Sequence, residues 1–365
     1  MNFNRRIFLG LALLASFSAF AQTTPRTQVT IRGEQFFING KPTYPNRRWK
    51  GHNIEGLLMN SRMVQGIFDD LNPETAANWA YPDTKKWDAD RNTDEFVAQM
   101  ETWRRYGLLS FTINMQGGSP YGYSSQQPWD NAGYTPDGTP RPEYLARLAR
   151  ILDRADALGM VPMLGLFYFG QDERLRDEAA VVRAVSSMVD WLHAKNYRHV
   201  LIEVNNESNV RYDHDILKPA RVHELIELVK KKEQNGHRYL VGTSYGGGFI
   251  PLPNVVRASD FILLHGNGVS DPAKITSMVQ RTRAVEGYTP KPILFNEDDH
   301  FNFEQETNNF TAAVQSYTSW GYFDFRGKEE PMTQGYQTVP VDWGINSERK
   351  KQFFNLLQEI TGGLR

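Results

Sequence analysis

The stretch "HVLIEVNNESN", residues 199–209, puts a hydrophobic run directly in front of two asparagines and a glutamate. A strand covered on both faces explains the hydrophobic run, because such strands read as continuous apolar segments. Asn205, Asn206 and Glu207 carry polar groups that lose favourable hydration when they are buried. We therefore expect a buried parallel strand that ends at these residues and presents them at the edge of a sheet.

Similar apolar runs recur along the chain, at "GHNIEGLLM" (51–59), "LLSFTINM" (108–115), "MVPMLGLFYF" (160–169), "RYLVGTSY" (238–245), "DFILLHGNG" (260–268), "KPILFNEDD" (291–299) and "TSWGYFDF" (318–325). Amphipathic helical patterns lie between most of them, at 93–107, 142–159, 177–195, 220–236, 271–287, 303–317 and 347–363. The connection at 251–259 has room for one helical turn at most. Strand and helix thus alternate about eight times, which is typical of a parallel sheet covered by helices.

The number of strands favours a (β/α)8 TIM barrel over a doubly wound open sheet. An open sheet more often has fewer strands and a glycine-rich nucleotide-binding turn after the first one. The glycine run "YGGGFIP" at 245–251 is followed by neither a helix nor an acidic partner. We therefore predict an α/β fold with a (β/α)8 barrel over residues 50–365.

Residues 22–49 form a separate N-terminal segment in this interpretation. Within this segment, residues 28–45 alternate between apolar and polar and turn at Asn39-Gly40, which predicts a β-hairpin. Long loops at 60–92 and 116–141 carry tryptophans and tyrosines among turn-forming residues. We expect these loops on the C-terminal face of the barrel, where the active sites of this fold lie.

The chain begins "MNFNRRIFLGLALLASFSAFAQ". A basic start, an apolar run and an Ala-x-Ala site are typical of a secretory signal peptide, here residues 1–21. The Arg5-Arg6 pair also fits the twin-arginine type of signal. The apolar run is shorter than the ~20 residues of a membrane span. A periplasmic or extracellular protein with no membrane contact after signal cleavage is therefore expected.

Composition excludes several classes of function. The chain has no cysteine, which excludes a thiol nucleophile and a thiolate metal site. Its formal charge is -1, and loss of residues 1–21 removes two arginines and brings the charge to about -3. No nucleic-acid partner is expected, because such a protein needs a basic face. Aromatic residues make up 12% of the chain, which leaves some rings for the surface, where they suit the faces of sugars.

Polar residues stand at the ends of several predicted strands, where a barrel points them into its mouth. Glu207 ends the fourth strand and Glu297 ends the seventh. Two carboxyl groups about 5 to 5.5 Å apart suit retaining glycoside hydrolysis, in which one is the nucleophile and the other the acid/base. Further candidates for substrate contacts at or near strand ends are His52, Asn114, Asn206, Tyr245, His265, Asn267, His300 and Trp320.

Two of these segments resemble those of the clan A glycoside hydrolases. "IEVNNESN" resembles the E-I-x-N-E-P segment of their fourth strand, and "PILFNE" resembles the strand-seven segment that ends in their nucleophile. The hairpin "FFINGKP" is similar to one that many members carry, including family 5-like enzymes.

The resemblance implies a retaining hydrolase of β-linked oligo- or polysaccharides that needs no cofactor and no metal. It assigns Glu297 as the nucleophile, Glu207 as the acid/base, and Asn206 as the asparagine that binds the sugar 2-hydroxyl. It also implies that Trp320 lies beneath the sugar and that His265 is the strand-six histidine.

The sequence departs from the family pattern at three places. Ser208 replaces the proline after the acid/base, Asp298 and Asp299 replace an aromatic-glycine pair, and Asn267 replaces a tyrosine. Tyr245 is a candidate to supply the missing tyrosine. The resemblance gives Asn205 no role.

Two other interpretations stay open. Glu203, Glu207, His265, Asp298, Asp299 and His300 offer oxygen and imidazole ligands for a metal-dependent barrel hydrolase. Against this interpretation, the chain has neither an H-x-H nor an H-E-x-x-H spacing. The other interpretation is a carbohydrate-binding barrel without catalysis. The sugar, the linkage, internal or terminal cleavage and the oligomeric state stay open as well.

Overall fold

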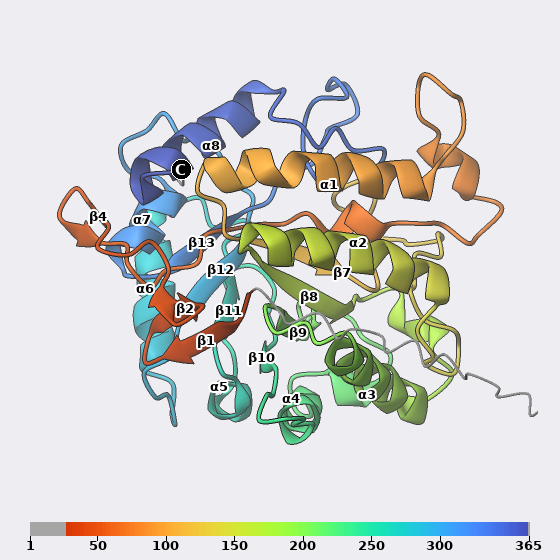
Figure 1. The fold of residues 1–365 in the computed structure, drawn as a ribbon, viewed down its shortest axis with the longest axis horizontal. Helices are drawn as coiled ribbons and strands as arrows, with labels where there is room; N and C mark the ends of the chain where they lie inside the picture. Colours follow the sequence, from red (N-terminus) through yellow and green to blue (C-terminus); the bar gives the residue numbers. More distant parts are fainter. Residues whose placement is uncertain (1–26, 364–365) are drawn as a thin grey trace, which may run out of the picture.

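The computed structural model describes residues 27–363, so the expected signal peptide lies outside the described residues (Figure 1). Within them, parallel strands follow one another in chain order around a closed barrel. These strands are β6 (Asn60–Ser61), β7 (Ser110–Asn114), β8 (Val161–Phe167), β9 (Leu201–Asn205), β10 (Leu240–Gly242), β11 (Ile262–His265), β12 (Ile293–Asp298) and β13 (Ser319–Tyr322). The predicted (β/α)8 fold is confirmed.

The barrel consists of two four-stranded parallel halves, β7 to β10 and β11 to β13 with β6. Backbone hydrogen bonds join the halves at both seams. Met63 N donates to Thr112 O at 3.0 Å between β6 and β7, and Asp260 N donates to Val241 O at 2.9 Å between β10 and β11. Because both seams are paired, the sheet has no free edge, and the carboxyl ends of all strands share one face.

A layer of helices surrounds the strands. It contains α1 (Ala89–Arg105), α2 (Pro142–Leu158), α3 (Glu178–Ala194), α4 (Val222–Lys231), α5 (Pro253–Ala258), α6 (Pro272–Arg283), α7 (Asn309–Gln315) and α8 (Glu348–Thr361), together with 3-10 turns η1 (Val64–Ile67), η2 (Ala76–Trp79), η3 (Asp172–Arg174) and η4 (Asp215–Leu217). Figure 1 shows α1 beside α2, and Tyr106 at the end of α1 meets Phe354 of α8 at 5.5 Å between ring centres. No helix within residues 27–363 is long and apolar enough to cross a membrane.

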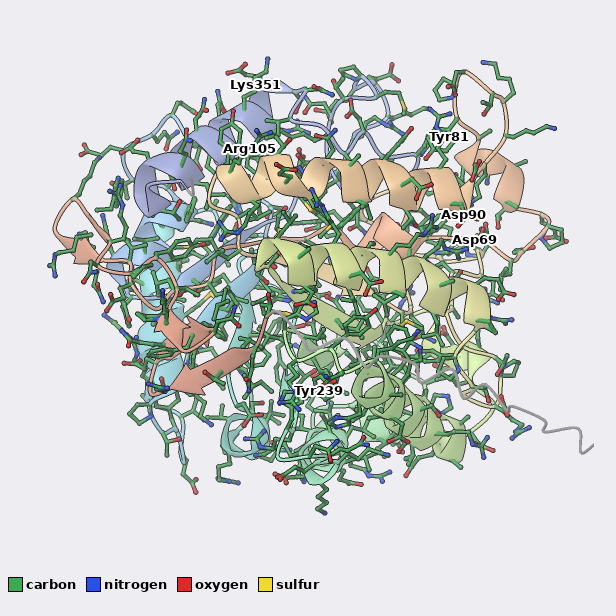
Figure 2. The ribbon with its side chains drawn as sticks, viewed as in Figure 1. Asp69, Tyr81, Asp90, Arg105, Tyr239 and Lys351 are labelled. Carbon is green, nitrogen blue, oxygen red and sulfur yellow. The ribbon has the colours of Figure 1, made fainter. Side chains whose placement is uncertain are left out.

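Helix boundaries follow capping residues rather than the apolar periodicity alone. The helix predicted at 93–107 begins at Ala89, because the Asp88 side chain accepts a hydrogen bond from Arg91 N. Figure 2 shows Asp90 and Arg105 at opposite ends of α1, an arrangement that matches the helix dipole. The pattern at 303–317 gives only α7, which begins after the Asn308 capping box.

The N-terminal segment covers the barrel end at which the strands begin. β1 (Val29–Arg32), β2 (Gln35–Ile38) and β3 (Lys41–Pro42) form an antiparallel sheet, and the predicted turn at Asn39-Gly40 joins β2 to β3. Phe36 packs on Phe261, which precedes β11, at 6.2 Å between ring centres. The hairpin of β4 (Arg48–Trp49) and β5 (His52–Asn53) follows it. This segment therefore lies away from the mouth.

The strand predicted at 51–59 is wrong in position, because the first barrel strand is β6. Gly51 and Gly56 have φ angles of 84° and 87°, a left-handed conformation that interrupts an extended strand. Leu57, Leu58 and Met59 are buried but lead into the strand without belonging to it.

Aromatic side chains anchor the long loops on the barrel rim. Trp79 is fully buried and contacts Tyr121 and Trp129 at 4.9 and 5.9 Å between ring centres. Tyr81, labelled in Figure 2, stacks on Trp87 at 5.5 Å. Most of these rings therefore fix the loops in place instead of facing the mouth.

Candidate active site

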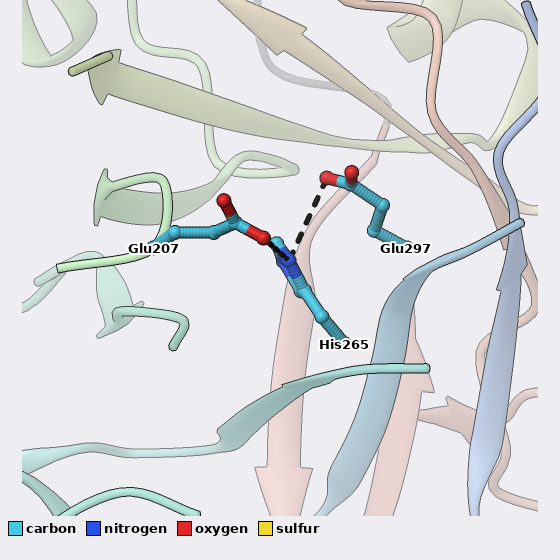
Figure 3. Close-up of side chains that lie close together, drawn as sticks. All are labelled: Glu207, His265 and Glu297. Atoms are coloured by element: carbon cyan, nitrogen blue, oxygen red, sulfur yellow. Dashed lines mark hydrogen bonds and ion pairs between the residues drawn. The ribbon is translucent and has the colours of Figure 1, made fainter. Parts of the chain in front are cut away.

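Strands four, six and seven of the barrel bring Glu207, His265 and Glu297 together at its carboxyl end. His265 Nδ1 lies 2.9 Å from Glu207 Oε1 and 3.7 Å from Glu297 Oε2. Figure 3 shows the imidazole between the two carboxyl groups. One carboxylate oxygen of each glutamate lies within 4.8 Å of the other. The two glutamates therefore form a close pair with a shared histidine.

Glu297 is a buried carboxyl group with three cationic or amide neighbours. Arg62 Nη1 lies 2.9 Å from Oε2, and Asn267 Nδ2 donates to Oε1 at 2.8 Å. Burial raises the pKa of Glu297 above the usual value for glutamate, although Arg62 and His265 favour the ionised form. Arg62, His265 and Asn267 thus supply the charge and the donor that a buried carboxylate needs.

Glu207 is held in an unusual backbone conformation. Its φ is 53°, in the left-handed region, and its N–H donates to Ser244 Oγ at 2.9 Å. The next residue, Ser208, donates its own N–H to Ser244 O at 2.9 Å. A proline cannot make this bond, because it has no N–H. The departure from the family pattern at Ser208 therefore has a structural reason.

The histidine also sets the protonation of Glu207. Burial would raise the pKa of Glu207, but the hydrogen bond from His265 and the charges of His265 and Arg62 bring it below the usual value. Burial would lower the pKa of His265, and the carboxylates of Glu297 and Glu207 raise it instead. Both shifts therefore favour the proton on the imidazole, with Glu207 Oε1 as its hydrogen-bond acceptor.

Arg62 is the main residue that the sequence interpretation missed. It follows β6 directly and is 1% exposed. Besides its ion pair with Glu297, its Nη1 donates to Asn206 Oδ1 at 3.0 Å. Phe323, just after β13, lies over the guanidinium at 5.8 Å from the ring centre. The sequence predicts the first strand at 51–59, whereas β6 is Asn60–Ser61, so Arg62 falls in a predicted loop and not at a predicted strand end.

Replacement of Arg62 by methionine is expected to lower kcat/KM about 100-fold or more, the usual cost of losing one electrostatic partner of a reacting group. Without the guanidinium the pKa of Glu297 rises further, so the acidic limb of the pH–activity profile should move to higher pH. The measurement is kcat/KM against pH on a substrate that the protein turns over, with thermal unfolding recorded in parallel.

Arg62→Lys keeps the charge and is the matched control for Arg62→Met. It should retain more activity and shift the acidic limb less. Equal losses for the two variants, with no pH shift in either, would contradict an electrostatic role for Arg62.

Asn205 now has a structural account. Its Nδ2 donates to Leu217 O at 2.9 Å, and its Oδ1 accepts from Thr243 Oγ1 at 2.7 Å. The side chain is fully buried. Asn205 therefore ties the loop after β9 to the neighbouring strand β10, which fixes the chain that carries Asn206 and Glu207.

Trp320 does not lie beneath a sugar, contrary to the expectation from the resemblance. It is fully buried and stacks on Phe310 of α7 at 4.8 Å between ring centres. It also meets Phe353 of α8 at 6.1 Å, and its Nε1 donates to Asp298 Oδ2 at 3.0 Å. The side chain thus points outward to the helix layer, because alternation along the strand places it on the outer side of the barrel.

His52 is not brought to the mouth either. It belongs to β5 on the opposite end of the barrel, in a surface hollow that Arg32, Glu34 and Tyr317 also line. The reason is the shifted first strand. His52 had been assigned to a barrel strand that begins only at Asn60.

Three other candidates lie close to the strand ends, but among residues 27–363 none of the three forms a hydrogen bond or an ion pair with either glutamate. Asn114 is buried at the end of β7 with its amide unpartnered, and Tyr245 is buried after β10. His300 Nδ1 lies 2.9 Å from Asp298 Oδ1 and 3.2 Å from Asp299 Oδ1. Asn267, not Tyr245, contacts Glu297.

A second group of possible metal ligands consists of Asp298, Asp299 and His300. One ligand atom from each of them lies within 4.8 Å of the other two. Asp298 already accepts hydrogen bonds from Trp320 Nε1 and, at 2.9 Å, from Asn309 Nδ2. Its carboxylate therefore links β12 to the helix layer. Glu203 lies apart from this group and is fully buried, and Asn296 Nδ2 is 3.4 Å from its Oε1.

No model of a known protein family matches this chain, and no curated protein is similar in sequence. Solved structures of glycoside hydrolases are similar in fold. An endo-1,4-β-mannanase from Rhizomucor miehei superposes with a TM-score of 0.55 and 10% identity, covering 92% of this chain and 99% of that one. A β-glucosidase from Thermotoga maritima gives 0.53 and 10%, covering 86% and 100%.

Two further structures agree with this result. A family 5 glycoside hydrolase from Prevotella bryantii gives a TM-score of 0.51 and 11% identity, covering 84% of this chain and 96% of that one. A Bacteroides vulgatus protein assigned to the glycoside hydrolases gives 0.53 and 13%, and this chain covers 62% of its length. The chain therefore has the (β/α)8 fold of the clan A, family 5-like glycoside hydrolases.

Proposed function

We propose that the protein is an exported glycoside hydrolase that cleaves β-linked oligo- or polysaccharides with retention of configuration. Glu297 is the nucleophile and Glu207 is the general acid/base. Export to the periplasm or the extracellular space rests on the signal-like residues 1–21. The substrate class rests on the fold likeness together with the strand-end glutamates.

The observation that carries the proposal is the short distance between the two carboxyl groups. An oxygen of Glu207 and one of Glu297 lie within 4.8 Å. Inverting enzymes need about 6.5 to 9.5 Å between their carboxyl groups to admit a water molecule, whereas retaining enzymes need about 5 to 5.5 Å. The arrangement therefore supports a double displacement.

Each residue has a defined task in this mechanism. Glu297, ionised beside Arg62, forms a bond to the anomeric carbon as the glycosidic bond breaks. Glu207 takes up the proton that it shares with His265 and gives it to the leaving oxygen, and in the second step Glu207 takes a proton from the water that hydrolyses the glycosyl–Glu297 ester. Asn206 is held by Arg62 next to Glu297, where its Nδ2 is free to bind a sugar hydroxyl.

A glycan panel followed by NMR of the first-formed anomer tests the proposal directly. A β-configured product that appears before mutarotation would support retention. An α-configured first product would contradict it, because a single displacement inverts the anomeric centre.

The same assay separates the two alternatives. Activity that is lost in EDTA and restored by a divalent metal would favour the metal-dependent hydrolase. Tight oligosaccharide binding without turnover across the panel would favour a binding protein. The proposed mechanism predicts full activity in EDTA.

A further inference from the structure

A chain of hydrogen bonds connects Glu297 to a loop on the far side of the mouth. Asn267 Nδ2 donates both to Glu297 Oε1 at 2.8 Å and to the Tyr123 hydroxyl oxygen at 2.6 Å. The Tyr123 hydroxyl then donates to Asp299 Oδ2 at 2.8 Å. The loop after β7 thereby meets the residues that follow β11 and the end of β12.

The row of hydrogen bonds has a carboxylate at each end, Glu297 and Asp299. These two acceptors determine which group is the donor in each hydrogen bond between them. An ionised carboxylate only accepts, an amide nitrogen has two protons to donate, and a hydroxyl has one. Asn267 therefore uses both N–H groups, one on Glu297 and one on Tyr123. A flipped amide would turn Oδ1 toward the Glu297 carboxylate and would leave the Tyr123 oxygen without its donor.

The Tyr123 ring packs against two aromatic side chains, although much of the residue is exposed to solvent. It meets Phe323 and Phe325 edge-on, at 5.5 and 5.3 Å between ring centres. Gly122 has a φ of 96°, and a Cβ there would come within 2.6 Å of the Phe325 ring. Tyr123 is nevertheless 55% exposed. The ring contacts and the close packing at Gly122 thus hold the hydroxyl within hydrogen-bond distance of Asn267 and Asp299.

The phenol stays neutral in this place. Partial desolvation of the phenol, together with the negative charges of Glu297 and Asp299, raises the pKa of Tyr123 well above the usual value for tyrosine. A neutral hydroxyl can donate its proton to Asp299 in a hydrogen bond. Its oxygen can at the same time accept a hydrogen bond from the Asn267 amide.

We propose that Tyr123 is a positioning residue that holds the Asn267 amide on Glu297. It acts through Asn267 and does not touch the reacting atoms. The inference rests on the proposed function for the role of Glu297, but the hydrogen-bond relay can be tested without any substrate. It also accounts for Asn267, whose short side chain needs a second residue to fix its orientation.

Tyr123→Phe removes the hydroxyl and keeps the ring contacts, so it isolates the relay. The pKa of Glu297 can be measured by 13C NMR of protein labelled at the glutamate carboxyl carbons, with Glu297→Gln to assign the signal. Without the tyrosine oxygen the Asn267 amide is no longer held on Glu297, and weakening of that one donor to the ionised form should raise the pKa of Glu297 by about 0.5 to 1. Tyr121→Phe is the matched control, because it removes a hydroxyl from the same loop beside Trp79.

Kinetics give a second measurement on whichever 4-nitrophenyl β-glycoside proves to be a substrate. Tyr123→Phe should lower kcat about three- to tenfold, the worth of one hydrogen bond, and move the acidic limb of the profile to higher pH. In an Asn267→Ala background the same change should have no further effect, since the two residues act as one unit.

An unchanged Glu297 titration in Tyr123→Phe would overturn the inference, as would an equal change in Tyr121→Phe. A raised KM in Tyr123→Ala with wild-type behaviour in Tyr123→Phe would also overturn it, because the ring would then serve as a sugar platform. If Glu297→Gln retains activity, the proposed function fails. The NMR titration still decides the relay in that case.

Discussion

Replacement of Glu297 by alanine is expected to reduce turnover by several orders of magnitude, because in the proposed mechanism its carboxylate forms the covalent bond to the sugar. Glu297 is the carboxyl group that Arg62 contacts at 2.9 Å and Asn267 binds at 2.8 Å. The measurement is kcat/KM on an activated aryl β-glycoside. Sodium azide should restore part of the activity, since the small anion can occupy the space that the side chain leaves.

The configuration of the azide product identifies the role of the residue. In Glu297→Ala, azide attacks the substrate from the face that the nucleophile occupied, so an α-glycosyl azide should form from a β-glycoside. Turnover near that of the wild type, or a β-azide, would refute Glu297 as the nucleophile.

Glu203→Gln is the matched control for this prediction. Glu203 is fully buried in the same barrel, and burial raises its pKa, which favours the uncharged form. Glutamine has the same shape and no charge, so this variant should lose little activity. If Glu203→Gln lost as much activity as Glu297→Ala, the loss in Glu297→Ala would not be specific to Glu297.

The close approach of Glu207 and Glu297 could be predicted from the sequence, because both residues lie at or just beyond the carboxyl ends of strands with clear apolar runs. Glu207 follows the run at 199–204 and Glu297 follows the run at 292–295. In a parallel barrel, strand ends converge on one face whatever the loops do. The order of strands alone therefore brings these two side chains together.

Arg62 could not be found in this way, because the first barrel strand is only two residues long and leaves almost no apolar pattern. Trp320 was assigned to the wrong face for a related reason. A strand buried on both sides gives no periodicity that separates inside from outside. Phe323, three residues later and just after this strand, is the aromatic residue that lies over Arg62.

The contacts of Tyr123 cannot be predicted from the sequence around it. It lies in the loop between β7 and α2, and its partners Asn267 and Asp299 follow other strands more than a hundred residues later. Only the folded loop brings them together. The same holds for Asn205, whose partners Leu217 and Thr243 become neighbours through the barrel.

Replacement of Glu207 by alanine should give a loss that depends on the leaving group. Alkyl glycosides, which need a proton on the departing oxygen, should be cleaved about 1,000-fold more slowly, within the usual range for general acid catalysis. A 2,4-dinitrophenyl glycoside needs no such proton, so its first step should be almost unaffected. The measurement is kcat/KM for both substrates.

Azide again separates the roles of the two glutamates. In Glu207→Ala it should attack the glycosyl–Glu297 ester and give a β-glycosyl azide, the opposite anomer to that expected from Glu297→Ala. An equal loss for both leaving groups would contradict an acid/base role for Glu207.

The pH profile should connect this role to His265. Glu207 Oε1 and His265 Nδ1 are 2.9 Å apart, and the pKa of Glu207 is lowered while that of His265 is raised. These opposite shifts describe one proton that the pair shares, so the profile reports the pair and not either residue alone. The general acid is competent when that proton moves from Nδ1 to Oε1 as the glycosidic oxygen approaches.

Activity should therefore fall on the basic side only when the pair loses its proton, at a pH set by the raised pKa of His265. In Glu207→Ala this basic limb should disappear for the dinitrophenyl glycoside, while the acidic limb from Glu297 should remain. A basic limb that persists unchanged in Glu207→Ala would mean that the proton belongs to another group, and Glu207 would no longer be the acid.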